Sequence, residues 1–162
     1  MTRGRIVALH SLLQEDLVVL RFEARDRDGV LREMTGKLEA RHKAVAGDGL
    51  LEKLLEREEM GTTAIGQGVA IPHCRTKKLK SPALLLGLSE EGIAFESVDG
   101  QLAHVFFLLI SPQDNPNAGL RLLAAIAGLN RGSRTLAAKL LKAGTAADVL
   151  KILKAEEEKT LA

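Results

Sequence analysis

Two long, nearly uninterrupted apolar runs constrain the fold of this chain more than any other feature of its 162 residues. The segments PALLLGLS (82–89) and AHVFFLLIS (103–111) hold few polar residues, and residues that favour turns bound them. Such runs are typical of strands buried on both faces, which occur in sheets covered by helices on two sides. They predict an α/β fold with these two strands inside it.

Strand-like and helical patterns alternate in the first half of the chain. The segment 16–24 mixes Val, Leu and Phe with polar residues and predicts a strand. Helical spacing of apolar residues follows, with Asp28 expected to cap that helix. The segment 49–59 predicts a short amphipathic helix, and the glycine-rich segment 61–68 predicts a loop. GVAIP (68–72) then predicts a short strand that ends at its proline.

The second half of the chain predicts three helices, in 120–129, in 136–141 and after Thr145, which is expected to cap the last one. The charged tail, about 155–162, is expected to fray. No repeat, low-complexity segment or linker interrupts residues 1–162, so one α/β domain is predicted.

Composition excludes several classes of function. Aromatic residues make up only 2% of the chain and the net charge is +2, which is too little stacking surface and charge for a nucleic-acid-binding protein. A single cysteine suits a reducing cytosol, and no apolar run is long enough for membrane insertion, so a cytoplasmic protein is expected. No pair of histidines has metal-ligand spacing, so no metal site is expected.

The segment REEMGTTAIGQGVAIPHCR (57–75) is the most informative part of the sequence. Gly66 and Gly68 permit positive φ and close backbone approach, and such a loop can turn N–H groups inward to bind an anion. The spacing is not that of a P-loop. Pro72 restricts the backbone on both sides of itself and is expected to present His73 rigidly at the end of a strand.

A neutral imidazole is a nucleophile that can carry a phosphoryl group. Transfer of that group needs positive charge and hydrogen-bond donors around the phosphoryl oxygens. We expect Arg57 and the hydroxyls of Thr62 and Thr63 to converge on His73, with further positive charge from Arg75.

Each of these residues also has a purely structural interpretation. A histidine in a loop is often a surface residue, Gly66 and Gly68 fit a plain turn, and Arg57 fits a solvated cation at the end of a helix. Cys74 is interpreted as a buried small side chain rather than a reactive thiol.

The segment REEMGTTAIGQGVAIPH resembles the active-site signature of enzyme IIA domains of the bacterial phosphotransferase system, in their mannitol/fructose and nitrogen-regulatory class. The positions that match the signature without gaps are Arg57, Glu58, Thr63, Gly66, Gly68, Pro72 and His73. A weaker resemblance extends over most of the chain, and the nitrogen-regulatory branch looks closest.

The resemblance implies a mixed, mostly parallel sheet with helices on both faces. It implies that His73 accepts a phosphoryl group on Nε2, that Arg57 supports the phosphate, and that no cofactor or metal takes part. The implied donor is phosphorylated HPr or its nitrogen-branch relative. A regulatory target protein or a IIB domain is expected downstream.

The sequence departs from the family pattern at Gly119, where the family usually carries a second histidine. Asn117 or Arg121 could substitute for it, transfer could be slow but sufficient for signalling, or phosphorylation could be vestigial. Three functions therefore remain open: a nitrogen-regulatory phosphocarrier, the IIA component of a mannitol/fructose-type sugar transporter, and a regulatory binding module that is not phosphorylated.

Overall fold

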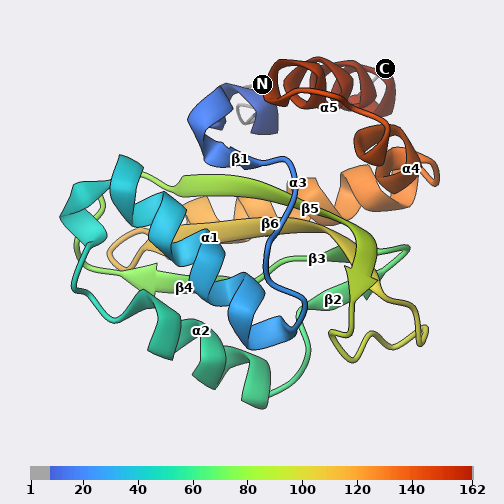
Figure 1. The fold of residues 1–162 in the computed structure, drawn as a ribbon. Helices are drawn as coiled ribbons and strands as arrows, with labels where there is room; N and C mark the ends of the chain where they lie inside the picture. Colours follow the sequence, from blue (N-terminus) through green and yellow to red (C-terminus); the bar gives the residue numbers. More distant parts are fainter. Residues whose placement is uncertain (1–7, 162) are drawn as a thin grey trace.

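The structure, a computed structural model, describes residues 8–161 as one mixed sheet flanked by helices (Figure 1). The strands are β1 (Val18–Val19), β2 (Ala64–Gly66), β3 (Val69–Ala70), β4 (His73–Thr76), β5 (Ala83–Ile93) and β6 (Ala103–Pro112). Their order is β1-β5-β6-β3-β2, and β4 also pairs with β6. The pairings β1–β5, β3–β6 and β4–β6 are parallel, whereas β5–β6 and β2–β3 are antiparallel. The two apolar runs are thus confirmed as the central strands, β5 and β6.

Within residues 8–161, five α-helices flank this sheet on both faces (Figure 1). They are α1 (Arg27–Arg41), α2 (Leu50–Glu59), α3 (Pro116–Gly132), α4 (Leu136–Leu141) and α5 (Ala146–Leu161). Short 3₁₀ turns occur at Leu9–Leu12, Glu15–Leu17 and Lys43–Val45. Helix α1 packs on β5 and α2 on β4, while α3 packs on β6 from the opposite side. This arrangement confirms the predicted α/β fold.

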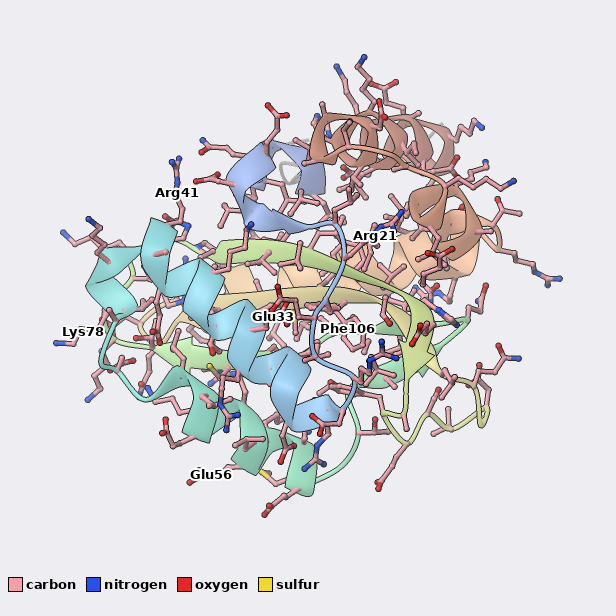
Figure 2. The ribbon with its side chains drawn as sticks, viewed as in Figure 1. Arg21, Glu33, Arg41, Glu56, Lys78 and Phe106 are labelled. Atoms are coloured by element: carbon pink, nitrogen blue, oxygen red, sulfur yellow. The ribbon has the colours of Figure 1, made fainter. Side chains whose placement is uncertain are left out.

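The core consists almost entirely of aliphatic side chains, as the near absence of aromatic residues requires. Phe106 of β6 lies at its centre, with the rings of Phe22 and Phe95 edge-on at centroid distances of 5.5 and 5.2 Å. Figure 2 shows this ring inside the molecule, whereas the labelled side chains of Arg41 and Lys78 project outward from the surface. Among residues 8–161, no helix combines the length and the apolar character needed to cross a bilayer.

The strand predicted at 16–24 is mostly absent. Only Val18–Val19 form a strand on β5, although the Phe22 N–H still donates to the Leu88 carbonyl of β5 at 3.3 Å. The N–H groups of Glu23 and Ala24 donate to the Glu33 carboxylate of α1 rather than to a neighbouring strand. The predicted cap of α1 was also wrong. Asp26 caps the helix by accepting a hydrogen bond of 2.7 Å from the Gly29 N–H.

The predicted frayed tail is instead part of α5, which continues to Leu161, while Ala162 lies outside the described residues. The Glu157 carboxylate accepts hydrogen bonds from the N–H groups of Leu9 and His10, at 2.7 and 2.9 Å. These bonds join the two ends of the described chain, so the last turns of α5 have tertiary partners that hold them in place.

Candidate functional site

His73 lies just after a proline that separates two short strands, β3 and β4. Strands β3 and β4 run along the same edge of β6, where Val69 pairs with Val105 and His73 pairs with Leu109. Pro72, which has no N–H to donate, lies between them and interrupts the path. His73 is therefore the first residue of β4. The short strand predicted at 68–72 is present as β3, and His73 lies at a strand end as expected, although at the start of the next strand, because pairing with β6 resumes directly after the proline.

The ring of His73 is partly buried, and its two nitrogens have different environments. Nδ1 lies 2.7 Å from the carbonyl oxygen of Ile71. A carbonyl oxygen can only accept, so Nδ1 carries the ring hydrogen and Nε2 keeps its lone pair. Burial lowers the pKa of His73 below its usual value, Arg57 and Arg75 lower it further, and the Ile71 carbonyl opposes them. The imidazole is thus neutral and nucleophilic at neutral pH.

His73 faces a small cavity of about 120 Å³ between the sheet and the start of α3. His73 and Arg75 lie two residues apart on β4, so their side chains share one face of the sheet. Leu109 and Ser111, their partners on β6, line the same cavity, and Gly119 of α3 closes it. Two groups of phosphate-binding chemistry, a guanidinium and a hydroxyl, therefore line the cavity with the nucleophile.

Arg57 lies in the last turn of α2, where its Nη1 donates a hydrogen bond of 2.9 Å to the Gly61 carbonyl. Its positive charge acts on the pKa of His73, which indicates that the two side chains interact electrostatically. Arg75 exerts the same effect and also lines the cavity. Arg75 therefore lies in the cavity with the histidine, whereas Arg57 does not line the cavity and acts on the ring only through its charge.

The two threonine hydroxyls are engaged elsewhere. Thr63 donates from its hydroxyl and its N–H to the carboxylate of Glu58, whose pKa is raised by burial. The Thr62 hydroxyl donates to the Phe95 carbonyl and accepts from the Ala64 N–H. The expectation that these hydroxyls converge on His73 is not met, because a buried carboxylate and two main-chain groups use them.

The glycine pair forms the tight turn between β2 and β3. Gly66 and Gly68 have φ of 93° and 80°, a region that favours glycine. The N–H of the intervening Gln67 donates to the Asp99 carboxylate at 3.0 Å. The expected anion-binding loop therefore holds a carboxylate of the chain itself, and β2 lies within the segment predicted to be only loop.

Asn117 and Arg121 are both exposed, and neither lines the cavity. Gly119, two residues from each, faces Ser111 across the cavity wall. A Cβ built on Gly119 would lie 2.7 Å from the Ser111 hydroxyl oxygen. Sequence reasoning missed Ser111, because only the register of β4 on β6 brings it next to His73, and no local pattern encodes that register.

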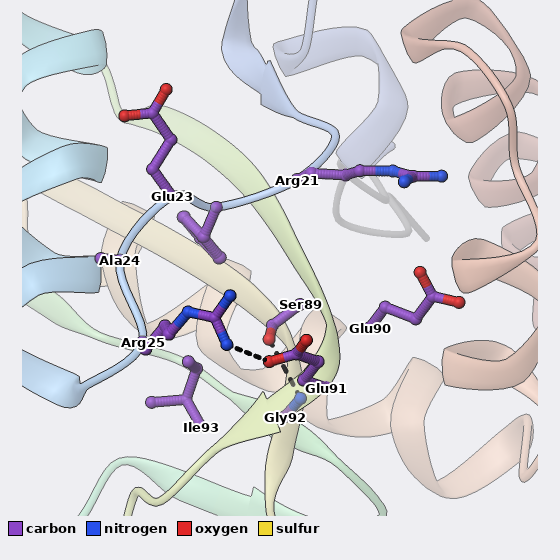
Figure 3. Close-up of a pocket in the computed structure, with 10 residues that line it drawn as sticks. Arg21, Glu23, Ala24, Arg25, Ser89, Glu90, Glu91, Gly92 and Ile93 are labelled. Carbon is purple, nitrogen blue, oxygen red and sulfur yellow. Dashed lines mark hydrogen bonds and ion pairs between the residues drawn. The ribbon is translucent and has the colours of Figure 1, made fainter.

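A larger cavity of about 300 Å³ lies between the segment 21–25 and the residues 89–93 of β5 (Figure 3). Arg25 and Glu91 form an exposed ion pair of 2.9 Å across it. No residue of the segment 57–75 lines this cavity. In the part of the chain that the structure describes, no cluster of His, Cys, Asp and Glu has an arrangement suited to a metal ion.

Comparison with known proteins identifies the family of this chain. Residues 11–156 match the model of the family described as phosphoenolpyruvate-dependent sugar phosphotransferase system, EIIA 2. A nitrogen regulatory protein of Bradyrhizobium diazoefficiens is 40% identical over 104 residues, covering 64% of this chain and 67% of the relative. The fructose-specific EIIABC component of Bacillus subtilis is 33% identical over 118 residues, which cover 73% of this chain but only 19% of that longer protein.

Solved structures show the same fold. The nitrogen regulatory protein IIA-Ntr of Neisseria meningitidis superposes with a TM-score of 0.77 at 28% identity, covering 90% of this chain and 98% of that one. The mannitol IIA of Escherichia coli superposes with a TM-score of 0.70 at 16% identity, covering 87% and 98%. A match to the family model over most of the chain, joined to this fold, shows that the chain belongs to the EIIA 2 family of the phosphoenolpyruvate-dependent sugar phosphotransferase system.

Proposed function

We propose that this chain is a cytoplasmic phosphocarrier of the nitrogen-regulatory type, which accepts a phosphoryl group on Nε2 of His73. One observation carries the proposal. The Ile71 carbonyl holds the hydrogen on Nδ1, so the other nitrogen of a partly buried, neutral ring is left with its lone pair beside a cavity that contains Arg75. This is the arrangement that a phosphoryl acceptor needs.

The transfer is a direct displacement at phosphorus. The lone pair of Nε2 forms the new N–P bond while the bond from phosphorus to the donor atom breaks, and the donor keeps that electron pair. Negative charge spreads over the three phosphoryl oxygens in the transition state. The positive charges of Arg57 and Arg75, both of which act on His73, oppose that charge and are the proposed phosphate support.

The proposed donor is phosphorylated HPr or its nitrogen-branch relative, and the proposed output is control of a partner protein by the phosphorylation state. The nitrogen branch is supported by the Bradyrhizobium relative and by the Neisseria structure, both named as nitrogen regulatory proteins. Added negative charge at His73 changes how an acidic or basic partner surface binds there, so phosphorylation can act as a switch.

A second candidate function is the IIA component of a fructose or mannitol transporter. The Bacillus fructose relative supports it, as does the mannitol IIA fold, which is also solved in complex with phosphorylated IIB. In this case the phosphoryl group passes from His73 to a IIB domain. Restored fructose or mannitol uptake in a strain that lacks the cognate IIA would favour this candidate over the nitrogen branch.

The direct test is to incubate the full chain with enzyme I, HPr and phosphoenolpyruvate. We expect acid-labile, base-stable phosphate on the wild type and none on His73→Ala. Equal labelling of the variant would show that the acceptor is another residue. Absence of label on the wild type, with a sugar IIA labelled in parallel as a positive control, would favour a binding module that is not phosphorylated.

A further inference from the structure

We propose that Ser111 is a catalytic residue of this transfer, and that its hydroxyl donates a hydrogen bond to the phosphoryl group as it arrives on His73. The inference rests on the proposed function, because it assigns a role inside the same site. It goes beyond that function by naming a donor that neither the sequence motif nor the family relationship identifies.

The position of Ser111 carries the proposal. It pairs with Arg75 on the neighbouring strand, two pairs beyond the pair of His73 with Leu109. Residues two apart on a strand point to the same face, so Ser111 lies diagonally across from His73 on the cavity side. Both side chains line the cavity of about 120 Å³. Liquid water takes about 30 Å³ per molecule, so this space has room for a phosphoryl group of four heavy atoms.

The Ser111 hydroxyl is available to a ligand. The residue is only 6% exposed, yet no hydrogen bond within residues 8–161 engages its hydroxyl. Among those residues, no fully buried side-chain oxygen or nitrogen lacks a partner, so the Ser111 oxygen must keep access to the cavity. A mostly buried hydroxyl without a partner, here on the next-to-last residue of β6, would normally cost free energy, which an incoming acceptor oxygen would offset.

Gly119 allows this arrangement. Its missing side chain lets α3 approach β6 so closely that an added Cβ would lie 2.7 Å from the Ser111 oxygen and 2.8 Å from the Ser111 Cβ. A side chain at position 119 would therefore occupy the space of the hydroxyl. Gly119 and Ser111 therefore depend on each other: the glycine of α3 leaves space next to β6, and the serine of β6 places its hydroxyl in that space.

The closing experiment measures single-turnover phosphorylation of the full chain by HPr phosphorylated with enzyme I and phosphoenolpyruvate. We expect Ser111→Ala to slow the transfer by about 10- to 100-fold, since the loss of one donor to a transition-state oxygen costs up to about 100- to 1,000-fold elsewhere. The matched control is Ser89→Ala. Ser89 is also buried, but its oxygen accepts from the Gly92 N–H on β5, away from this cavity.

A second readout separates a chemical role from a structural one. The ³¹P resonance of phosphorylated His73 should shift in Ser111→Ala and stay in place in Ser89→Ala, because only the first variant removes a donor to the phosphoryl oxygens. Urea unfolding of each variant checks that the fold is intact.

The outcomes discriminate between the two proposals. Slower transfer with a shifted ³¹P resonance supports the role of Ser111. A wild-type rate and an unshifted resonance in Ser111→Ala overturn it and leave the phosphocarrier function standing. Absence of label on the wild type itself overturns both.

Discussion

His73 and Cys74 are neighbours in the chain, yet their side chains face opposite sides of strand β4. His73 lines the cavity beneath α3, whereas Cys74 lies among groups on the α2 side, where Lys53 and Asp48 act on its pKa. Alternation along a strand requires this separation. The motif therefore holds a reactive side chain and an inert one at adjacent positions.

The thiol of Cys74 should be unreactive in the folded protein. Burial raises its pKa to about 12, and the thiolate is the form that reacts with electrophiles. We expect alkylation by iodoacetamide at pH 8 to be slower than that of an ordinary thiol by about three orders of magnitude, given a free-thiol pKa of about 8.5. Alkylation of the same protein in strong urea is the control. Equal rates in the two states would contradict the assignment.

The pKa of His73 should lie below 6.5 and should depend on Arg57. Its burial and the charges of Arg57 and Arg75 all favour the neutral ring. Removing one cation with Arg57→Gln should therefore raise the pKa, as measured by NMR titration of the ring protons. Lys77→Gln is the control, because the charge of Lys77 is not among those that act on the ring. An unchanged pKa in Arg57→Gln would separate Arg57 from the site.

The lowered pKa of His73 should also affect how the stability of the protein depends on pH. In the folded state His73 binds its proton less tightly than in the unfolded chain, so its contribution to the free energy of unfolding falls as the pH drops below 6.5. His73→Gln removes this contribution. We expect urea unfolding to show a smaller loss of stability between pH 7 and pH 5 for the variant than for the wild type. Identical pH dependence would show that the pKa of His73 is not lowered on folding.

Gly119→Ala should destabilise the protein by about 1–3 kcal/mol, the usual cost of forcing extra atoms into a packed interior. The added Cβ would press on Ser111, so Ser111→Gly in the same chain should recover part of the loss. Gly128→Ala on the same helix is the control. Its Cβ would meet nothing closer than 3.9 Å, and the change should be neutral or stabilising by up to about 1 kcal/mol. Additive effects at 111 and 119 in a double-mutant cycle would contradict the contact.

Thr63→Val should cost about 1–3 kcal/mol at pH 7, because the buried Glu58 carboxylate loses a hydroxyl donor. Burial already raises the pKa of Glu58, and losing this donor should raise it further, so the loss should shrink as the pH falls toward 4 and the carboxyl becomes protonated. Thr135→Val is the control, since Thr135 is exposed and makes no side-chain cap. A loss independent of pH would indicate a packing defect instead.

The long elements could be predicted from the sequence because their patterns are local and sustained. The runs that became β5 and β6 are apolar over most of their length, and α2 has a clear amphipathic stripe. Short elements were missed where a side chain competes with the sheet for the backbone. Glu33 takes the N–H groups that would have extended β1, and the choice of Asp26 over Asp28 as cap depends on backbone angles at two nearby aspartates.

Within the candidate site, His73 and Arg75 could be singled out because they lie in one segment with a recognisable order, and the role of Arg57 in that segment stays a prediction. Thr62 and Thr63 lie in the same segment, yet their hydroxyls face a carbonyl and a carboxylate that are placed by tertiary packing. Ser111 could not be found at all, because its relation to His73 exists only across the register of two paired strands.

The proline break has one more consequence. The hydrogen on Nδ1 of His73 is held by a peptide oxygen two residues earlier, and every residue type at position 71 supplies that oxygen. In many enzymes a carboxylate performs this task and can be lost in a single codon change. Here a main-chain oxygen decides which ring nitrogen carries the hydrogen. The side chain at position 71 can therefore change while Nε2 keeps its lone pair for bonding.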